Sequence, residues 1–233
     1  MVIGILECGS PPIDLIPRFG SYAEMMRRML GPEREYRTFD VTAGELPKSE
    51  TATAVYVITG SAAGVYDDLP WISALIRFLR GTRSKAKLVG ICFGHQIMAE
   101  AFGGKAAKSS NGWGVGLQRY HVTAAPARWM DDVAFVDAPA SHQDQVVTCP
   151  TDARVIATSD FTPFAGLDYG DAISFQFHPE FAPAYAKALI EARRGRLGSL
   201  ADLALGSYTQ EDDCARIAGW IGRFLDHEYG ERK

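Results

Sequence analysis

Residues 87–104 read KLVGICFGHQIMAEAFGG, an apolar run that passes directly into a helical pattern. Leu88–Ile91 has the unbroken apolar character of a strand buried on both faces. Gly90 and Gly94 allow a sharp turn between strand and helix, and the glycine pair at 103–104 is typical of a helix end. A strand that leads at once into a helix is the unit of parallel α/β sheets, so this stretch predicts that class of fold.

The rest of the chain repeats the alternation of strands and helices. Apolar runs predict strands at Val2–Leu6, Val55–Ile58, Val146–Val147, Val155–Ala157 and Ala172–Phe177. Helical spacing of apolar residues predicts helices over 22–30, 71–79 and 217–225. We therefore expect a three-layer α/β/α sandwich with a mostly parallel central sheet and helices on both faces. The second half has more strands and shorter connections, which predicts a small added antiparallel portion.

The composition is that of an ordinary globular protein. The chain has 233 residues, of which 47% are hydrophobic and 22% charged, and these values predict a single domain over residues 1–233. The formal net charge of −4 provides no electrostatic reason to expect nucleic acid or an anionic membrane as a partner. No apolar run approaches the roughly 20 residues that span a bilayer, and the N-terminus lacks the basic region of a signal peptide. We therefore expect a cytoplasmic protein.

One of the four cysteines lies in a reactive context. Cys8, Cys92, Cys149 and Cys214 are far apart, without the spacing of a zinc site, so we expect separate thiols and no metal. Around Cys92 the G-x-C-x-G pattern resembles the nucleophile elbow of α/β-hydrolases, with cysteine in place of serine. An exposed Cys92 at a helix N-terminus would favour the thiolate, and the N–H of Phe93 would face a developing oxyanion. The alternative is a small buried cysteine in a tight connection.

A second motif, SFQFHPEF at 174–181, supplies candidate partners for this cysteine. Side chains two apart on an extended segment share a face, and Pro179 keeps the preceding residue extended. His178 and Glu180 are thus predicted to form a base oriented by a carboxylate. The alternative is an ordinary surface strand end. His95 is a rival base, but it lies on the helix after the elbow and would have to fold back to reach the sulfur.

Together the two motifs closely resemble the class I glutamine amidotransferases, the Cys-His-Glu glutaminase family. GICFGHQ at 90–96 and FHPE at 177–180 occur in the family's order and at a separation that suits one domain. The resemblance covers nearly the whole chain and implies a flavodoxin-like fold. It also implies a catalytic triad of Cys92, His178 and Glu180.

The resemblance implies further roles around the triad. The turn TGSAAG at 59–64 occupies the place of the family's glycine-rich turn, so the N–H of Gly60 would be the second oxyanion donor beside that of Phe93. The family more often has Gly-Gly-Pro at this turn. We therefore expect an oxyanion hole, the site of the two N–H donors, that is shaped differently or forms only when substrate binds. Gln96 matches a family glutamine that helps to bind substrate.

SHQDQV at 141–146 resembles the Ser-His-x-Asp loop of the GMP synthetase glutaminase domain, which binds the amino-acid end of glutamine. By that resemblance Ser141 belongs to the substrate pocket, His142 shapes it, and Asp144 pairs with the substrate ammonium. From the residues alone the stretch is an ordinary polar loop.

The function implied is hydrolysis of the γ-glutamyl amide of glutamine, or of another γ-glutamyl compound, through a Cys92 thioester. No cofactor is expected, and no phosphate-binding motif is present. The chain resembles a stand-alone GMP synthase-like glutaminase that passes ammonia to a partner synthetase. One alternative is a γ-glutamyl peptide hydrolase acting alone, with the proline-rich segment 10–20 as a wall of its cavity. A non-catalytic regulatory or binding subunit is another, and a peptidase or chaperone of the DJ-1/PfpI type is a third.

Overall fold

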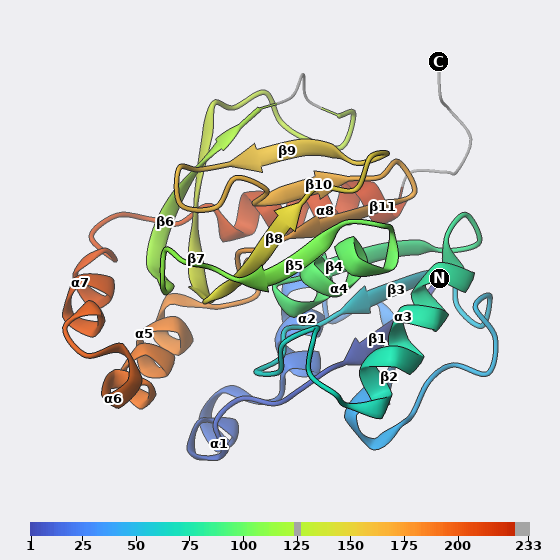
Figure 1. Ribbon diagram of the computed structural model, residues 1–233, viewed down its shortest axis with the longest axis horizontal. Helices are drawn as coiled ribbons and strands as arrows, with labels where there is room; N and C mark the ends of the chain where they lie inside the picture. Colours follow the sequence, from blue (N-terminus) through green and yellow to red (C-terminus); the bar gives the residue numbers. More distant parts are fainter. Residues whose placement is uncertain (124–126, 227–233) are drawn as a thin grey trace.

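A nine-stranded sheet runs through the computed structural model, which describes residues 1–123 and 127–226 (Figure 1). In chain order its strands are β1 (Val2–Glu7), β2 (Glu35–Asp40), β3 (Val55–Ile58), β4 (Lys87–Ile91), β6 (Gly114–Val122), β7 (Phe135–His142), β9 (Arg154–Thr158), β10 (Gly166–Asp168) and β11 (Ala172–Phe175). Across the sheet their order is β2-β1-β3-β4-β11-β10-β9-β6-β7. A separate two-stranded sheet pairs β5 (Lys105–Lys108) with β8 (Asp144–Thr148).

The large sheet has a parallel half and an antiparallel half. The strands β2, β1, β3, β4 and β11 run parallel, as their apolar sequences predicted. The strands β10, β9, β6 and β7 continue the sheet with antiparallel pairing. The parallel core with an added antiparallel portion is confirmed. Strands β6 and β7 were not predicted individually, because each mixes polar residues with glycine or proline.

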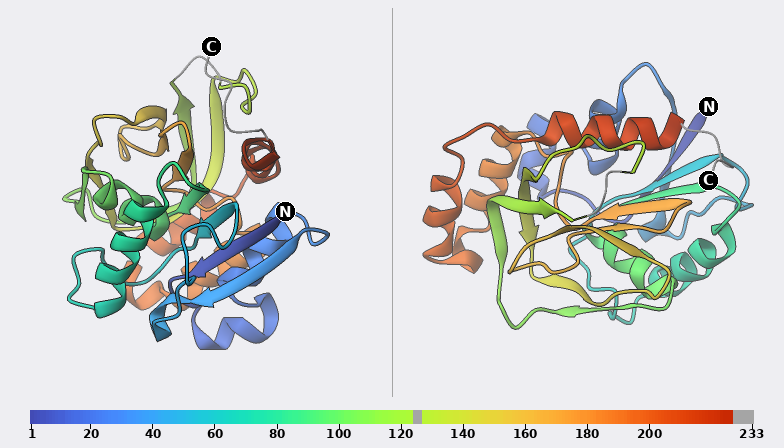
Figure 2. Two further views of the ribbon diagram at one scale, coloured as in Figure 1. Left: turned by 90° about the vertical axis from the view of Figure 1, so that its right-hand side faces the viewer. Right: turned by 90° about the horizontal axis from the view of Figure 1, so that it is seen from above.

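Helices cover both faces of the sheet (Figure 2). On one face lie α2 (Tyr22–Leu30) and α8 (Cys214–Asp226), whose apolar residues share a core with alternate residues of β1, β3, β4 and β11. On the other lie α3 (Pro70–Thr82) and α4 (Phe93–Ala101), which form a second core with the opposite strand faces. The three helices predicted from helical spacing are thus confirmed as α2, α3 and α8, and the helix predicted to follow Leu88–Ile91 is confirmed as α4.

Six further helical segments lie in the described part of the chain. They are the 3-10 helices η1 (Ile13–Leu15) and η2 (Val41–Ala43) and the helices α1 (Ile16–Phe19), α5 (Pro183–Ala192), α6 (Arg194–Leu197) and α7 (Leu200–Gly206). Helix α7 packs against β6, where Ser207 Oγ accepts a hydrogen bond of 2.8 Å from the N–H of Leu117. Within the described residues, no helix is long and apolar enough to cross a membrane.

The parallel strands end side by side. Leu6 of β1 is in register with Ile58 of β3, Ile58 with Gly90 of β4, and Ile91 with Phe175 of β11. The segments that follow these strands therefore meet at one edge of the sheet, where open α/β proteins bind their ligands.

Candidate active site

Cys92 lies on a strained turn between β4 and α4. It is the N-cap residue of α4, with φ 55° and ψ −103°, in a region that side chains rarely adopt. The turn requires glycine on both sides. A Cβ on Gly90 would lie 2.5 Å from the carbonyl oxygen of Gly94, and one on Gly94 would lie 2.4 Å from that of Ile58. This is the geometry of a nucleophile elbow.

The thiol of Cys92 is buried rather than exposed as expected. Only 6% of the residue is accessible, because segments that follow β3 and β11 close around it. The Cβ of Cys92 lies 3.8 Å from the Cβ position at Gly60. In the segment after β11, the Gln176 Nε2 lies 3.6 Å from the Cys92 Sγ. The elbow therefore presents its sulfur to a pocket and not to open solvent.

His178 and Glu180 lie together, as their spacing predicted. The His178 Nδ1 is 2.8 Å from the Glu180 Oε1, and both side chains are buried. The imidazole stacks on Phe181, with ring centroids 3.9 Å apart, and the His178 N–H donates to the carbonyl of Pro139 at 2.8 Å. These contacts hold the ring in one orientation beside Cys92, which also acts on it electrostatically.

The electrostatics favour a protonated imidazole. Burial by itself lowers the pKa of His178, but the charges of Glu180 and Cys92, together with hydrogen bonds to both, raise it well above its ordinary value. The second carboxylate oxygen of Glu180 is buried and has no hydrogen-bond partner in the part of the chain that the structure describes. The imidazolium is thus the main counter-charge for Glu180.

Gly60 and Phe93, the two predicted backbone donors, both lie beside Cys92, Gly60 across the site and Phe93 next in sequence. A Cβ on Gly60 would lie 3.3 Å from the His178 Cε1, so this turn lies directly against the imidazole. The turn is held by Thr59, which donates its N–H to the carbonyl of Leu6 at 3.1 Å and accepts the N–H of Cys8 at 2.9 Å. Within residues 1–123 and 127–226, neither the Gly60 nor the Phe93 N–H donates a hydrogen bond.

Cys92 opens into a polar pocket of about 260 Å³. The predicted substrate residues Gln96, Ser141, His142 and Asp144 all line it. The Ser-His-x-Asp stretch is not the loop expected. Ser141 and His142 end β7, and Asp144 begins β8, so a single residue separates the two strands. Pairing of β7 with β6 and of β8 with β5 gives these polar residues a fixed backbone.

The sequence comparison agrees with this geometry. The family model described as glutamine amidotransferase class-I matches residues 28–193, most of the chain. The chain belongs to the class I glutamine amidotransferase family. This chain is 28% identical over 211 residues to a putative glutamine amidotransferase-like protein of Schizosaccharomyces pombe. The match covers 83% of this chain and 84% of that one. This chain is also 30% identical over 171 residues to gamma-glutamyl peptidase 2 of Arabidopsis thaliana, covering 70% and 69%.

Solved structures show the same fold. A glutamine amidotransferase from Thermotoga maritima superposes on this chain with a TM-score of 0.79. The match covers 97% of this chain and 99% of that one at 19% identity.

Two other histidines of the amidotransferase are neutral. Burial lowers the pKa of His142 to about 3, with a further contribution from the charge of His178. Burial likewise lowers the pKa of His95 to about 3, and His142 lowers it further. The His95 Nδ1 is 2.8 Å from the Ser174 Oγ, and the ring does not line the pocket. His95 is thus buried in the fold and does not stand beside the sulfur as a rival base.

Sequence reasoning missed two polar residues of the site. Gln176 precedes His178 by two residues, and this alternation was the available signal that it also faces Cys92. Arg193 lines the pocket and donates from Nη1 to the Ser141 Oγ at 2.8 Å. No sequence pattern predicted that Arg193 belongs to the pocket, because Arg193 follows α5 and is far along the chain from Ser141. Among the described residues, no group of three His, Cys, Asp or Glu side chains could hold a metal ion.

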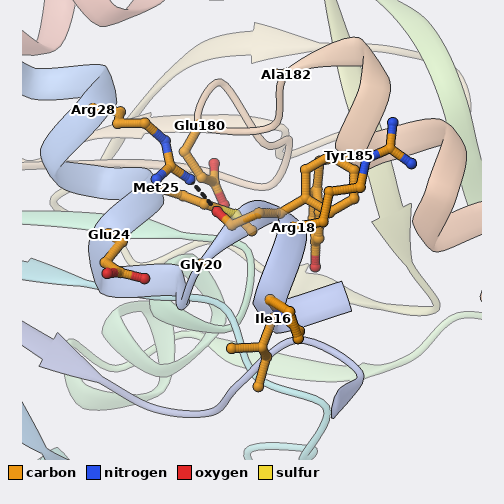
Figure 3. A pocket seen from close by; sticks show the side chains of 11 residues that line it. Ile16, Arg18, Gly20, Glu24, Met25, Arg28, Glu180, Ala182 and Tyr185 are labelled. Atoms are coloured by element: carbon orange, nitrogen blue, oxygen red, sulfur yellow. Dashed lines mark hydrogen bonds between the residues drawn. The ribbon is translucent and has the colours of Figure 1, made fainter. Parts of the chain in front are cut away.

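The segment 10–20 does not line the Cys92 pocket. Residues 16–20 instead border a second, larger pocket of about 530 Å³, with Glu180 and Tyr185 in its wall (Figure 3). Arg28 donates to the carbonyl of Phe19 across this pocket. The expectation of a cavity wall was therefore wrong for the Cys92 pocket, because α1 packs against α2 and α5 beside Glu180.

We expect Glu180→Gln to lower the pKa of His178 toward its ordinary value. Because the pKa of His178 is higher in the folded than in the unfolded chain, its protonation stabilises the fold. This contribution is complete below the unfolded-state pKa of about 6.5 and is lost as the pH rises through the raised pKa of the folded state. The variant should lose that contribution at pH 7. Nitrogen-15 NMR of the imidazole reports its protonation, and Glu191→Gln, at an exposed ion pair, is the control. A variant imidazole that stays protonated as in the wild type would contradict the role of Glu180.

Proposed function

We propose that this amidotransferase hydrolyses γ-glutamyl amides through a thioester on Cys92. The observation that carries the proposal is the buried Cys92–His178–Glu180 arrangement at the base of a polar pocket, beside two available amides. The Cys92 thiolate attacks the γ-carbonyl, and the N–H groups of Gly60 and Phe93 stabilise the oxyanion. One such donor lowers the barrier by about 3–4 kcal/mol in a serine protease.

Proton transfer is assigned to His178. As the C–N bond breaks, His178 gives its proton to the departing ammonia or amine. The neutral imidazole then takes a proton from water, which attacks the thioester, and glutamate leaves with the thiolate restored. Glu180 holds the imidazole in position and stabilises its charged form. The reaction uses only the thiol, the imidazole and backbone donors.

The amino-acid end of the substrate is assigned to the outer pocket. The Asp144 carboxylate is the proposed partner of the α-ammonium group. Desolvation and a hydrogen bond to Asp144 raise the pKa of Tyr66 to about 12, so the phenol beside this carboxylate keeps its proton at neutral pH. Arg193 is the proposed partner of the α-carboxylate, since its guanidinium lines the pocket and has no carboxylate partner among the described residues. Together the two charges would select an α-amino acid.

Arg193→Met should lower kcat/KM for glutamine about 10- to 100-fold, mainly through KM, because a hydrogen bond to a charged group contributes about 1.5–3 kcal/mol. Initial rates over a range of glutamine concentrations measure the effect. Arg194→Met is the matched control, because Arg194 is exposed and pairs with Glu191 and Asp202. Equal effects of the two substitutions would remove Arg193 from substrate binding.

A γ-glutamyl peptide is the second candidate substrate. Lys108 and Arg196 join Arg193 in the lining of the pocket, and neither forms an ion pair within the described ranges. Glutamine has one carboxylate, whereas a γ-glutamyl amino acid has a second on its amine part. These cations favour the latter substrate, and the Arabidopsis relative is named a gamma-glutamyl peptidase.

Ammonia release from glutamine, measured beside amine release from γ-glutamylglycine and γ-glutamyl ethylamide, tests the proposal. Preference for γ-glutamylglycine over the ethylamide favours a peptide hydrolase acting alone. Preference for glutamine favours a glutaminase that supplies ammonia to a partner synthetase. If none of the three is cleaved, and a glutamine-mimicking electrophile fails to label Cys92, the proposed function is wrong. We place the reaction in the cytoplasm, where free thiols stay reduced.

A further inference from the structure

Gln176 is a buried amide in contact with the Cys92 sulfur. Its side chain is fully inaccessible to solvent, and its Nε2 lies 3.6 Å from the Cys92 Sγ. Its backbone N–H donates to the carbonyl of Ala165 at 2.8 Å, which anchors the segment between β11 and His178. Gln176 therefore has little freedom to turn away from the sulfur.

The hydrogen-bond network determines which end of this amide faces Cys92. The Gln96 Nε2 lies 2.8 Å from the backbone carbonyl oxygen of Asp144, which can only accept. Gln96 must therefore present its NH₂ group there, and the same nitrogen lies 3.1 Å from the Gln176 Oε1. Because the Gln96 nitrogen is a donor, the Gln176 atom that faces it must be the acceptor, which is the amide oxygen. The other end of the Gln176 amide, which faces the sulfur, is then the NH₂ group.

We propose that Gln176 donates a hydrogen bond to the Cys92 thiolate and stabilises it, and that Gln96 is the positioning residue that keeps the Gln176 amide in this orientation. A hydrogen bond to an anion in a dry site is stronger than one between neutral groups. The sulfur then has two donors, the His178 imidazolium and the Gln176 amide. Both come from the segment after β11, where residues 176 and 178 share a face.

The network also links the nucleophile to the substrate pocket. Asp144 begins β8, and its carbonyl anchors Gln96. Its carboxylate is the proposed partner of the substrate ammonium, so one residue contributes to substrate binding and to the orientation of the amide at the sulfur. This last step rests on the proposed function, whereas the hydrogen bond to the sulfur does not.

The pH dependence of Cys92 alkylation by iodoacetamide tests the proposal without any substrate. Gln176→Leu removes the donor. Gln176→Glu keeps the shape of the side chain but places an acceptor at the sulfur. Gln145→Leu is the matched control, since Gln145 is a buried glutamine of β8 that does not line the pocket. Mass spectrometry of the Cys92 peptide follows the reaction separately from Cys8, Cys149 and Cys214.

We expect both Gln176 variants to raise the pH midpoint of Cys92 alkylation by about one pH unit, with the control unchanged. The kcat for the best γ-glutamyl substrate should fall about tenfold in Gln176→Leu, with little change in KM. Gln96→Leu should raise the midpoint by less, because it frees the amide to rotate but leaves it in place.

Wild-type midpoints in both Gln176 variants would overturn the proposal. If Gln176→Leu fails to fold, the isosteric Gln176→Glu decides. If neither variant folds, NMR of the wild-type chain tests the proposal instead. The chemical shifts of the Gln176 side-chain amide protons must then differ between the wild type and Cys92→Ser. A shifted midpoint in a protein that cleaves no γ-glutamyl compound would support the hydrogen bond and reject the proposed function.

Discussion

Cys92→Ser should fold normally and lose hydrolysis of every γ-glutamyl substrate, by about 10⁴-fold or more in kcat. A hydroxyl in place of the Sγ remains protonated at neutral pH, so it offers no anion to attack the carbonyl. The neighbouring His178 is held protonated by Glu180 and cannot readily remove the proton. The measurement is a single-turnover assay with the substrate that the wild type cleaves best.

Cys149→Ser is the matched control for this loss. Cys149 is a free, partly buried cysteine outside the Cys92 pocket, and we expect its replacement to leave kcat unchanged. Wild-type activity in Cys92→Ser would mean that the reaction takes place elsewhere. It would also favour a regulatory or binding role for the arrangement around Cys92.

Gly94→Ala should destabilise the fold by about 3 kcal/mol. The added Cβ would lie 2.4 Å from the carbonyl oxygen of Ile58 and 3.0 Å from its carbonyl carbon. Both are backbone atoms of β3, which is paired with β1 and β4, so they cannot move aside without disturbing the sheet. Urea unfolding of the purified variant measures the loss in free energy.

Gly222→Ala is the matched control in α8. Nothing lies within 4 Å of a Cβ at Gly222, and alanine is favoured over glycine inside a helix. We expect this variant to be more stable than the wild type by about 0.5–1 kcal/mol. Equal stability of the two variants would show that close packing of Gly94 on β3 is not what the elbow requires.

Local patterns predicted the parts of the fold that local contacts stabilise. Helix α2 begins and ends where predicted, because Ser21 and Glu24 form a capping box and Gly31 follows the last turn. The strands β3, β4 and β11 are apolar on both faces, and this pattern is sufficient to predict a buried strand. Strand β7, with Asp137, Pro139 and Ser141, has no such pattern, and its pairing with β6 makes it a strand.

Some residues of the candidate site follow from local sequence patterns, and others depend on the tertiary structure. The glycines around Cys92 predicted the turn, and a proline in an extended segment predicted that His178 and Glu180 share a side. The resemblance of the two motifs to one family then joined these residues into one candidate site. The residues alone left open whether Cys92 is exposed or buried, since its burial depends on the turns after β3 and β11. Arg193 could not be predicted either, because its contact with Ser141 joins residues 52 positions apart.

The sequence by itself determined the chemical groups of this protein and the turn that carries its thiol, because backbone freedom and side-chain alternation act over a few residues. Only the tertiary structure decided what surrounds the sulfur. Gln96 and Gln176 are 80 positions apart, and the orientation of their amides depends on the carbonyl of Asp144 in a third segment. Such contacts form where β4, β8 and β11 are brought together, and a hydrogen bond between distant segments leaves no periodic pattern in the sequence.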